Sequence, residues 1–313
     1  MLPTTAVLRV RNARWRPRER GFKRASSRHR QLRPDRRSDQ SDGRRGSDLV
    51  TGTVYLVGAG PGAPDLLTLR AARLLERADV VFYDALVRPD TLALARNARL
   101  VNVGKRAGRI STSQAFINRC LIQAARRHET VVRLKGGDPM LFGRAQEEID
   151  ALVGAGVACE VVPGVTAALA ACADLGISLT RRGASRTVAF VTPRTGAGES
   201  DSDWVSTAAA AETAVIYMGV GEAERVSKCL IAHGRSGETP VAIVANASLP
   251  EARAWYGTLA ELPALAPAGL RSPATIVLGE ILRARLGATE RNATKQLVAE
   301  WAKNVSRAAG SEA

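Results

Sequence analysis

The segment Thr53-Val-Tyr-Leu-Val57, followed at once by Gly58-Ala-Gly-Pro-Gly62 and then by Pro64, decides the fold of this 313-residue chain. The first five residues are mostly β-branched or aromatic, and they predict a short buried strand. The glycines predict a tight turn, and Pro64 suits the first turn of a helix. Leucines between positions 66 and 75 recur at helical spacing, so we expect a helix over residues 64–78.

The same alternation of strand and helix continues outward from this unit. We expect further strands at 79–83, 100–103, 130–134 and 159–162, with helices at 113–127 and 143–154. Such alternation predicts a mostly parallel sheet with helices on both faces. A second α/β unit follows, with strands expected at 187–191, 214–217, 241–244 and 274–278.

The chain therefore divides, in our interpretation, into four parts. They are a disordered basic extension (1–51), an N-terminal α/β domain (52–164), a C-terminal α/β domain (165–287) and a polar tail (288–313). The net charge is +15, but residues 1–50 hold 15 Lys and Arg against 5 acids, so +10 of it lies in the extension. We favour an extension without function over a nucleic-acid or membrane-binding arm or a transit peptide.

The composition also limits the compartment. No apolar run reaches the ~20 residues that span a bilayer, and no secretory signal is visible, so we expect a cytoplasmic protein. The four cysteines form no CxxC pair and have no histidine beside them, which argues against a zinc site and a disulfide framework.

The glycine turn at residues 58–62 admits two interpretations. With Ala63 it nearly matches the dinucleotide fingerprint, and Asp84 ends the next strand, so a nicotinamide or flavin oxidoreductase is a rival hypothesis. Pro61 argues against it, because a diphosphate needs free backbone N–H groups in this turn. The alternative is a plain tight turn.

Gly136-Gly-Asp-Pro139 is a sharper signal, because it stands at the carboxyl end of an expected strand, where open α/β sheets bind ligands. Paired glycines allow a ligand to approach the backbone closely, and Asp138 could accept hydrogen bonds from a ribose or an amino group. An ordinary strand-to-helix turn would use the same residue types.

Taken in order, the motifs resemble those of the uroporphyrinogen-III C-methyltransferase family within the tetrapyrrole methylases, over about residues 52–286. The segments that carry the resemblance, beside the two glycine turns, are Tyr83-Asp-Ala-Leu-Val87, Val103-Gly-Lys-Arg-Ala-Gly108, Val132-Arg-Leu-Lys135, Phe142-Gly-Arg144, Val162-Pro-Gly164, Leu179-Thr180, Tyr217-Met-Gly219 and Ser272-Pro-Ala274. The resemblance implies a mostly parallel N-terminal sheet, a mixed C-terminal sheet and an active site in the cleft between them.

The resemblance further implies S-adenosylmethionine as methyl donor, no metal, a homodimer, and no nucleic-acid or membrane partner. The implied reaction is methylation of uroporphyrinogen III at C2 and C7, giving precorrin-2 by way of precorrin-1. A sibling enzyme acting on a later precorrin is the alternative. The implied cofactor-binding residues are Pro61, Gly136, Gly137, Asp138, Leu141, Thr166, Ala167, Met218 and Ala247.

The chemistry fits residues that stand near these motifs. Asp84 resembles the family's proton acceptor and Lys105 its proton donor; otherwise they are a polar strand end and a surface lysine. Arg144 and Glu147 stand three residues apart at the start of a helix, so they can share a face. Arg144 is expected to be catalytic and Glu147 to bind the substrate. Arg144 would orient the substrate or stabilise developing negative charge and would not act as the base, because a guanidinium stays protonated in proteins.

A substrate rich in carboxylates suits a cluster of cations. The basic residues expected to bind its carboxylates are Arg106, Arg109, Arg133, Lys135, Arg181 and Arg182. The chain departs from the family pattern where histidines are usual, for example at Ile110 and Arg181, so no step is assigned to histidine.

Overall fold

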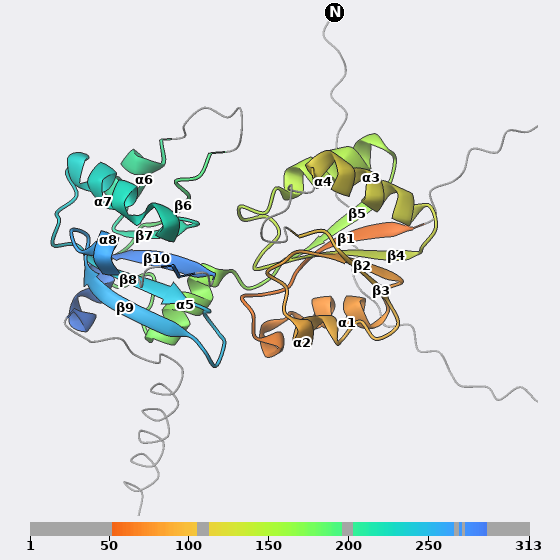
Figure 1. Ribbon diagram of the computed structural model, residues 1–313, viewed down its shortest axis with the longest axis horizontal. Coiled ribbons are helices and arrows are strands. Elements are labelled where there is room, and N and C mark those ends of the chain that lie inside the picture. The colour runs from red at the N-terminus through yellow and green to blue at the C-terminus, as the bar shows by residue number, and fades with distance from the viewer. Residues whose placement is uncertain (1–51, 105–112, 196–202, 266–268, 271–272, 287–313) are drawn as a thin grey trace, which may run out of the picture. The chain divides into compact units, whose positions relative to one another are not determined.

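The computed structural model describes residues 52–104, 113–195, 203–265, 269–270 and 273–286. Within these ranges, strands and helices alternate in two units, each built on its own five-stranded sheet (Figure 1). No helix in the described ranges is both long and apolar enough to cross a membrane.

The first sheet has the order β3-β2-β4-β1-β5, and all of its pairs are parallel. Its strands are β1 (Thr53–Gly58), β2 (Val80–Tyr83), β3 (Arg99–Asn102), β4 (Thr130–Lys135) and β5 (Ala158–Val162). The expected parallel N-terminal sheet is therefore confirmed, with strand ends within one or two residues of the prediction.

Helices cover both faces of this sheet (Figure 1). The first face packs on α3 (Gln114–Ala125) and α4 (Ala145–Gly154), through a core that includes Leu56, Leu121 and Leu152. The second face packs on α1 (Leu69–Glu76), near the short α2 (Pro89–Leu92). Because side chains alternate along a strand, Arg133 and Lys135 share the α3 and α4 face with Val131, whereas Val132 and Leu134 face α1.

The single helix expected over 64–78 is wrong in one respect. A 3-10 turn, η1 (Pro64–Leu66), precedes α1, and the chain is extended at Leu67 and Thr68. Thr68 caps α1, because its hydroxyl accepts a hydrogen bond from the backbone N–H of Ala71 at 3.2 Å. A threonine cap ends the preceding turn and begins a new helix at Leu69.

The second sheet has the order β6-β7-β10-β8-β9 and is mixed, as expected. Only β6 and β7 pair in parallel; β10 runs antiparallel to β7 and β8, and β8 antiparallel to β9. Its strands are β6 (Val188–Val191), β7 (Thr213–Tyr217), β8 (Pro240–Ala245), β9 (Arg253–Thr258) and β10 (Ala274–Gly279). The strand β9 was not predicted.

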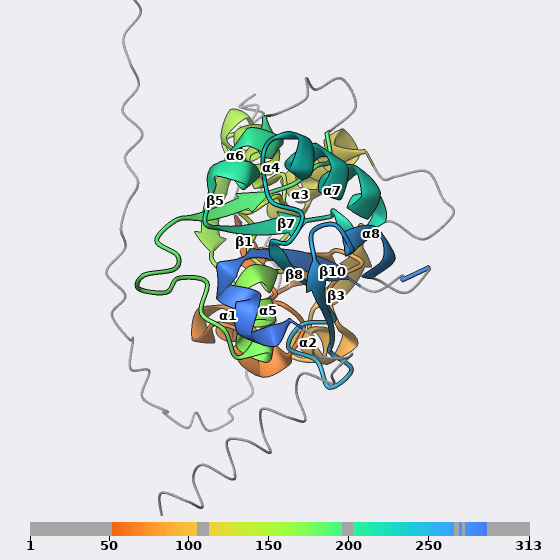
Figure 2. The ribbon, with the colours of Figure 1, turned by 90° about the vertical axis from the view of Figure 1, so that its left-hand side faces the viewer.

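The helices of the second unit also pack on both faces. One core joins the sheet to α6 (Trp204–Ala210) and α7 (Ala223–Ala232), with α8 (Leu262–Leu265) beside them. The other joins it to α5 (Ala167–Leu175) and η3 (Glu280–Arg285), which lie together in Figure 2. The remaining 3-10 turn is η2 (Val220–Glu222).

Candidate active site

Three parallel strands of the first sheet end in close backbone contact. A Cβ atom on Gly58, at the end of β1, would lie 2.6 Å from the Cα of Gly164 and 2.7 Å from the carbonyl oxygen of Gly137. Any side chain at Gly58 would therefore separate the segments that follow β1, β4 and β5. The glycine turn after β1 is also bonded to the turn after β4, because the N–H of Gly137 donates to the carbonyl of Gly60 at 2.7 Å.

Asp138 ties two of these segments together. Its Oδ2 accepts a hydrogen bond from the backbone N–H of Gly164 at 2.9 Å, and its Oδ1 accepts one from the N–H of Met140 at 2.8 Å. Each carboxylate oxygen thus has a backbone partner in the loops that follow β4 and β5. A contact of Asp138 with a ribose or an amino group stays a prediction, and it would use the remaining acceptor capacity of the carboxylate.

Tyr217, at the end of β7, holds the start of α5. Its hydroxyl lies 2.6 Å from the hydroxyl of Thr166 and accepts the backbone N–H of Ala168 at 3.0 Å. Burial raises the pKa of Tyr217, partly offset by these hydrogen bonds. The ring also contacts Phe142, with centroids 5.2 Å apart, and Phe190 at 6.2 Å.

The glycine turn also contacts the segment after β8. The backbone N–H of Ala63 donates to the hydroxyl of Ser248 at 3.1 Å, and the N–H of Ser248 donates to Asp174 of α5 at 2.7 Å. Burial raises the pKa of Asp174, partly offset by that hydrogen bond. Arg88 and Glu251 add an ion pair at 3.4 Å.

These contacts connect the segments that hold all of the predicted cofactor residues. Each residue follows the carboxyl end of a strand: Pro61 follows β1, Gly136, Gly137, Asp138 and Leu141 follow β4, Thr166 and Ala167 follow β5, Met218 follows β7, and Ala247 follows β8. The structure therefore brings their five segments together. Contact of these residues with a cofactor stays a prediction.

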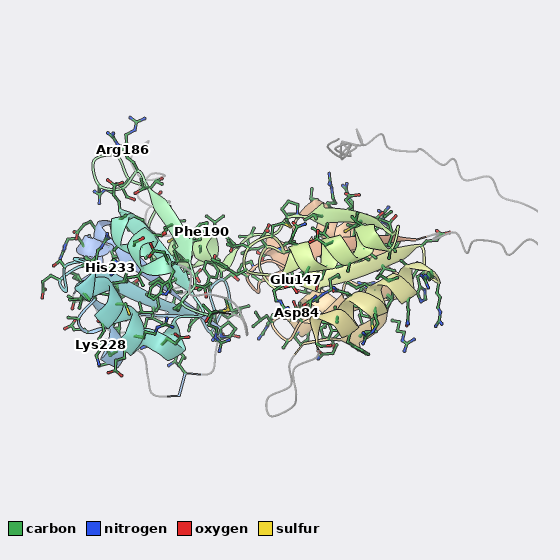
Figure 3. The ribbon with its side chains drawn as sticks, turned by 90° about the horizontal axis from the view of Figure 1, so that it is seen from above. Asp84, Glu147, Arg186, Phe190, Lys228 and His233 are labelled. Atoms are coloured by element: carbon green, nitrogen blue, oxygen red, sulfur yellow. The ribbon has the colours of Figure 1, made fainter. Side chains whose placement is uncertain are left out.

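Asp84 lies just after β2, with a partner that the sequence did not indicate. Its Oδ1 accepts a hydrogen bond from Nη2 of Arg133 at 2.7 Å. Figure 3 shows Asp84 and Glu147 at the same end of the first sheet. The expected neighbour of Asp84, Lys105, lies outside the described residues, as do Arg106 and Arg109.

Arg133 and Lys135 do not have the role expected of them. Both side chains are buried, at 3% and 4% exposure, and both bind Glu148, whose side chain has no exposed area. The distances are 3.0 Å from Nε of Arg133 to Oε1 and 3.1 Å from Nζ of Lys135 to Oε2. The prediction that they bind substrate carboxylates is wrong, because both are enclosed and neutralised inside the protein.

Burial lowers the pKa of Lys135, the charge of Arg133 lowers it further, and the carboxylates of Glu148 and Asp84 oppose both effects. Gln114, the first residue of α3, donates to Glu148 as well, at 3.0 Å. Two alternate positions of β4 thus carry buried cations that converge on one acid. Glu148 was missed by sequence reasoning, although two cations on one face of a buried strand were a signal that an acid must lie nearby.

Arg144 and Glu147 form the pair that their spacing predicted. Nε of Arg144 lies 2.7 Å from Oε1 of Glu147, and Nη2 lies 2.8 Å from Oε2, which is a bidentate geometry. This hydrogen bonding lowers the pKa of Glu147. Both side chains are exposed, as are Arg181 and Arg182, so these cations are accessible to an anion.

A family model for the tetrapyrrole (corrin/porphyrin) methylases matches residues 53–263, more than half of the chain. The chain belongs to the tetrapyrrole methylase family. Its curated relatives include siroheme synthase 3 of Aeromonas hydrophila, 47% identical over 232 residues, and siroheme synthase of Pseudomonas aeruginosa, 45% identical over 239 residues. These alignments cover 74% and 76% of this chain but 49% and 51% of the relatives, so this tetrapyrrole methylase spans about half of their length.

Solved tetrapyrrole methylases match more completely. The uroporphyrin-III C-methyltransferase from Thermus thermophilus, complexed with S-adenyl homocysteine, is 44% identical with a TM-score of 0.66. That match covers 74% of this chain and 100% of the other. A cobalt precorrin-4 methyltransferase is 30% identical, also with a TM-score of 0.66, over 77% of this chain and 98% of the other. The two-sheet fold of this methylase is therefore that of its solved relatives.

Proposed function

We propose that this chain transfers methyl groups from S-adenosylmethionine to C2 and C7 of uroporphyrinogen III, giving precorrin-2 by way of precorrin-1. The observation that carries the proposal is the match, over the full length of the other chain, to a uroporphyrin-III C-methyltransferase complexed with S-adenyl homocysteine. A later precorrin is the second candidate substrate, supported by the cobalt precorrin-4 methyltransferase. The identity of 44% against 30% favours uroporphyrinogen III.

The residues present suit S-adenosylmethionine. Gly137 has φ of +68°, and a Cβ atom there would meet only the Cα of Thr166, at 3.9 Å, so this backbone is open to a ligand. S-adenosylmethionine carries a ribose, a methionine chain and cationic sulfonium and amino groups. The Thr166 hydroxyl, the exposed Met218 and the Asp138 carboxylate offer it polar, apolar and anionic contacts.

The surface beside these loops suits a macrocycle with an apolar centre and an anionic rim. Large apolar side chains are exposed in the segments after β2, β4 and β7: they are Leu86, Met140, Phe142 and Met218. Exposed apolar groups that gather beside charged ones are typical of binding surfaces. Arg144 and Arg182 are the described cations that we assign to the substrate carboxylates, with Arg106 beside them in the proposal.

S-adenosylmethionine supplies an activated methyl group, so the protein must align the accepting carbon behind it and accept a proton. In-line alignment alone supplies up to ~7–11 kcal/mol of the barrier. We assign proton acceptance to Asp84, held by Arg133, and proton donation to Lys105. Within the described residues, no group of three or more His, Cys, Asp or Glu side chains could hold a metal ion. A metal-free reaction stays part of the proposal.

The same proposal includes an organisation for the whole chain. The catalytic unit comprises two domains, 52–164 and 165–287, with S-adenosylmethionine in the cleft between them, and it acts as a homodimer in the cytoplasm. It has no nucleic-acid or membrane partner. Residues 1–51 and 288–313 take no part in catalysis, so deletion of 1–51 should leave the methylation rate unchanged.

One assay tests the proposal directly. The protein is mixed with uroporphyrinogen III and S-adenosylmethionine, and the product mass is measured for the addition of two methyl groups. Isothermal calorimetry with S-adenosylhomocysteine tests cofactor binding separately. If the protein binds S-adenosylhomocysteine but adds no methyl groups to uroporphyrinogen III, a later precorrin becomes the proposed substrate. If NAD protects the protein from thermal unfolding and S-adenosylhomocysteine does not, the result favours an oxidoreductase.

A further inference from the structure

Four charged side chains form a connected cluster on the α3 and α4 face of the first sheet. Glu148 of α4 binds Arg133 and Lys135 of β4, and Arg133 alone continues to Asp84. We define these four residues as the buried ion cluster. Asp84 is its outermost member, with 29% of its side chain exposed, against 0–4% for the other three.

A buried ion cluster is weak evidence for stability. Removing charges from water costs several kcal/mol per ion, and well-packed apolar residues of similar volume are often as stable. The apolar neighbours on this face, such as Val131 and Leu152, show that aliphatic residues pack here readily. Stability alone therefore does not explain why charged residues occupy these buried positions, and the geometry of the buried ion cluster suggests a role in orienting a side chain.

The hydrogen bonds of Arg133 fix the plane of its guanidinium. Nε donates to Oε1 of Glu148 at 3.0 Å, Nη1 donates to the carbonyl of Leu134 at 3.2 Å, and Nη2 donates to Oδ1 of Asp84 at 2.7 Å. All three nitrogens thus have a partner. A lysine could provide the charge but not this rigid fork between two acids.

Glu148 is the fixed point of the cluster. Its Oε1 accepts from Arg133, Gln114 and Lys135, and its Oε2 accepts from Lys135. These donors come from α3 and β4, two elements that pack in the same hydrophobic core. The carboxylate of Glu148 consequently cannot turn without breaking several charge-assisted bonds.

We infer that Glu148 is a positioning residue for the carboxylate of Asp84 and that it acts through Arg133. The inference rests on the proposed role of Asp84 as proton acceptor. Glu148 touches no reacting atom; it sets the orientation of the guanidinium, and the guanidinium sets the orientation of the Asp84 carboxylate. Lys135 completes the cluster by balancing the second acid, so the four side chains carry no net charge between them.

The test begins with Glu148→Gln, which keeps the volume but removes the charge. A single amide oxygen cannot accept from Arg133, Lys135 and Gln114 together, and its NH2 group opposes the Lys135 ammonium. The guanidinium of Arg133 should then lose the hydrogen bond that fixes its orientation. We expect kcat to fall on the order of 10²-fold, the effect of small misplacements on oriented reactions. The KM for S-adenosylmethionine and the binding of S-adenosylhomocysteine should stay within about twofold.

Glu160→Gln is the matched control. Glu160 lies on β5 of the same sheet and pairs with Arg70, but both side chains are exposed. Its removal should change neither kcat nor KM. Equal losses of kcat in the two variants would overturn the inference, as would a fall in S-adenosylhomocysteine affinity that accounts for the whole effect of Glu148→Gln.

A second variant covers the case in which Glu148→Gln does not fold. Arg133→Lys keeps the cation beside Glu148 but cannot reach both acids, so it should reproduce the kcat loss. The double variant should then lose no more than either single variant, because both act through one path. Additive losses would contradict the inference.

A structural readout separates this inference from the proposed function. In a crystal structure of Glu148→Gln, or of Arg133→Lys, the Asp84 carboxylate should adopt a different side-chain orientation. An unchanged Asp84 would overturn the inference even if the wild-type protein methylates uroporphyrinogen III. If Asp84 is displaced in the variant but the wild-type protein methylates no tetrapyrrole, the positioning inference holds and the proposed function is wrong.

Discussion

The hydroxyl of Tyr217 caps the helix that begins after Thr166. The Thr166 side chain makes no capping bond of its own, and Tyr217, lying 2.6 Å from it, accepts the N–H of Ala168 instead. A strand of the second sheet thereby orients a residue assigned to the cofactor. This is how the tertiary structure sets the direction of the Thr166 hydroxyl.

Tyr217→Phe should therefore weaken cofactor binding while preserving the aromatic packing with Phe142 and Phe190. The variant removes both hydrogen bonds of the Tyr217 hydroxyl, to Thr166 and to the N–H of Ala168, so the Thr166 hydroxyl loses its fixed orientation. We expect the affinity for S-adenosylhomocysteine to fall about fivefold in calorimetry, which corresponds to about 1 kcal/mol, the typical contribution of one hydrogen bond to the cofactor. Tyr55→Phe, on β1, is the control and should bind as the wild type does. If Tyr217→Phe binds S-adenosylhomocysteine with unchanged affinity, Thr166 does not contact the cofactor.

Asp138→Asn should lower the free energy of unfolding. The carboxylate accepts from the N–H groups of Gly164 and Met140, whereas an amide has only one oxygen and presents an NH2 group to one of these donors. Hydrogen bonds to charged groups contribute about 1.5–3 kcal/mol, so urea unfolding should show a loss in that range. Asp203→Asn, at the exposed cap of α6, should show far less, since asparagine is an equally good cap.

Asp84→Asn should abolish methylation and leave S-adenosylhomocysteine binding intact. The amide can still accept a bond from Arg133 but cannot take a proton from the macrocycle. The product mass measures the loss of methylation, and calorimetry on the same sample measures the binding of S-adenosylhomocysteine. Full turnover by this variant would remove Asp84 from the mechanism.

Two thiols, that of the buried Cys172 and that of the half-buried Cys159, should make stability fall at alkaline pH. Burial raises the pKa of Cys159 to about 12 and of Cys172 to about 11, from a reference value of 9.0. Between pH 9 and these values the native state binds more protons than the unfolded state, so the unfolding free energy decreases as pH rises. Urea unfolding at pH 8 and pH 10 measures this slope, and Cys172→Ala should make it shallower. If the wild type and Cys172→Ala show the same slope of unfolding free energy against pH, groups other than Cys172 cause that slope.

Binding of the tetrapyrrole should weaken with added salt. The exposed cations Arg144 and Arg182 and the anionic rim of the macrocycle attract one another through water, where ions screen them. Titration of uroporphyrinogen at two salt concentrations measures the effect, and Arg182→Ala should reduce it. Affinity indifferent to ionic strength would count against a cationic binding surface.

Much of the first sheet could be predicted because its central strands β1, β2 and β4 are largely buried apolar runs that end at turn residues. β1, β2, β4 and β5 were each located within two residues by apolar runs that end at turn residues. The helix expected over 64–78 was not divided into η1 and α1, because the leucines on both sides of Thr68 recur at helical spacing and hide the cap between them. β9 was missed because it contains Gly257, a residue type that weakens a strand interior.

The sequence by itself determined the fold class, the family and the segments that bear the candidate site, because periodicity and glycine turns are local properties. Only the tertiary structure decided which charges face solvent. In the sequence Arg133 and Lys135 resemble substrate-binding cations, yet both are buried on the face of the sheet that α3 and α4 cover. They bind Glu148 there, 15 and 13 residues further along the chain. Burial and ion pairing depend on which helix covers which face of the strand, and no short stretch of residues contains that information.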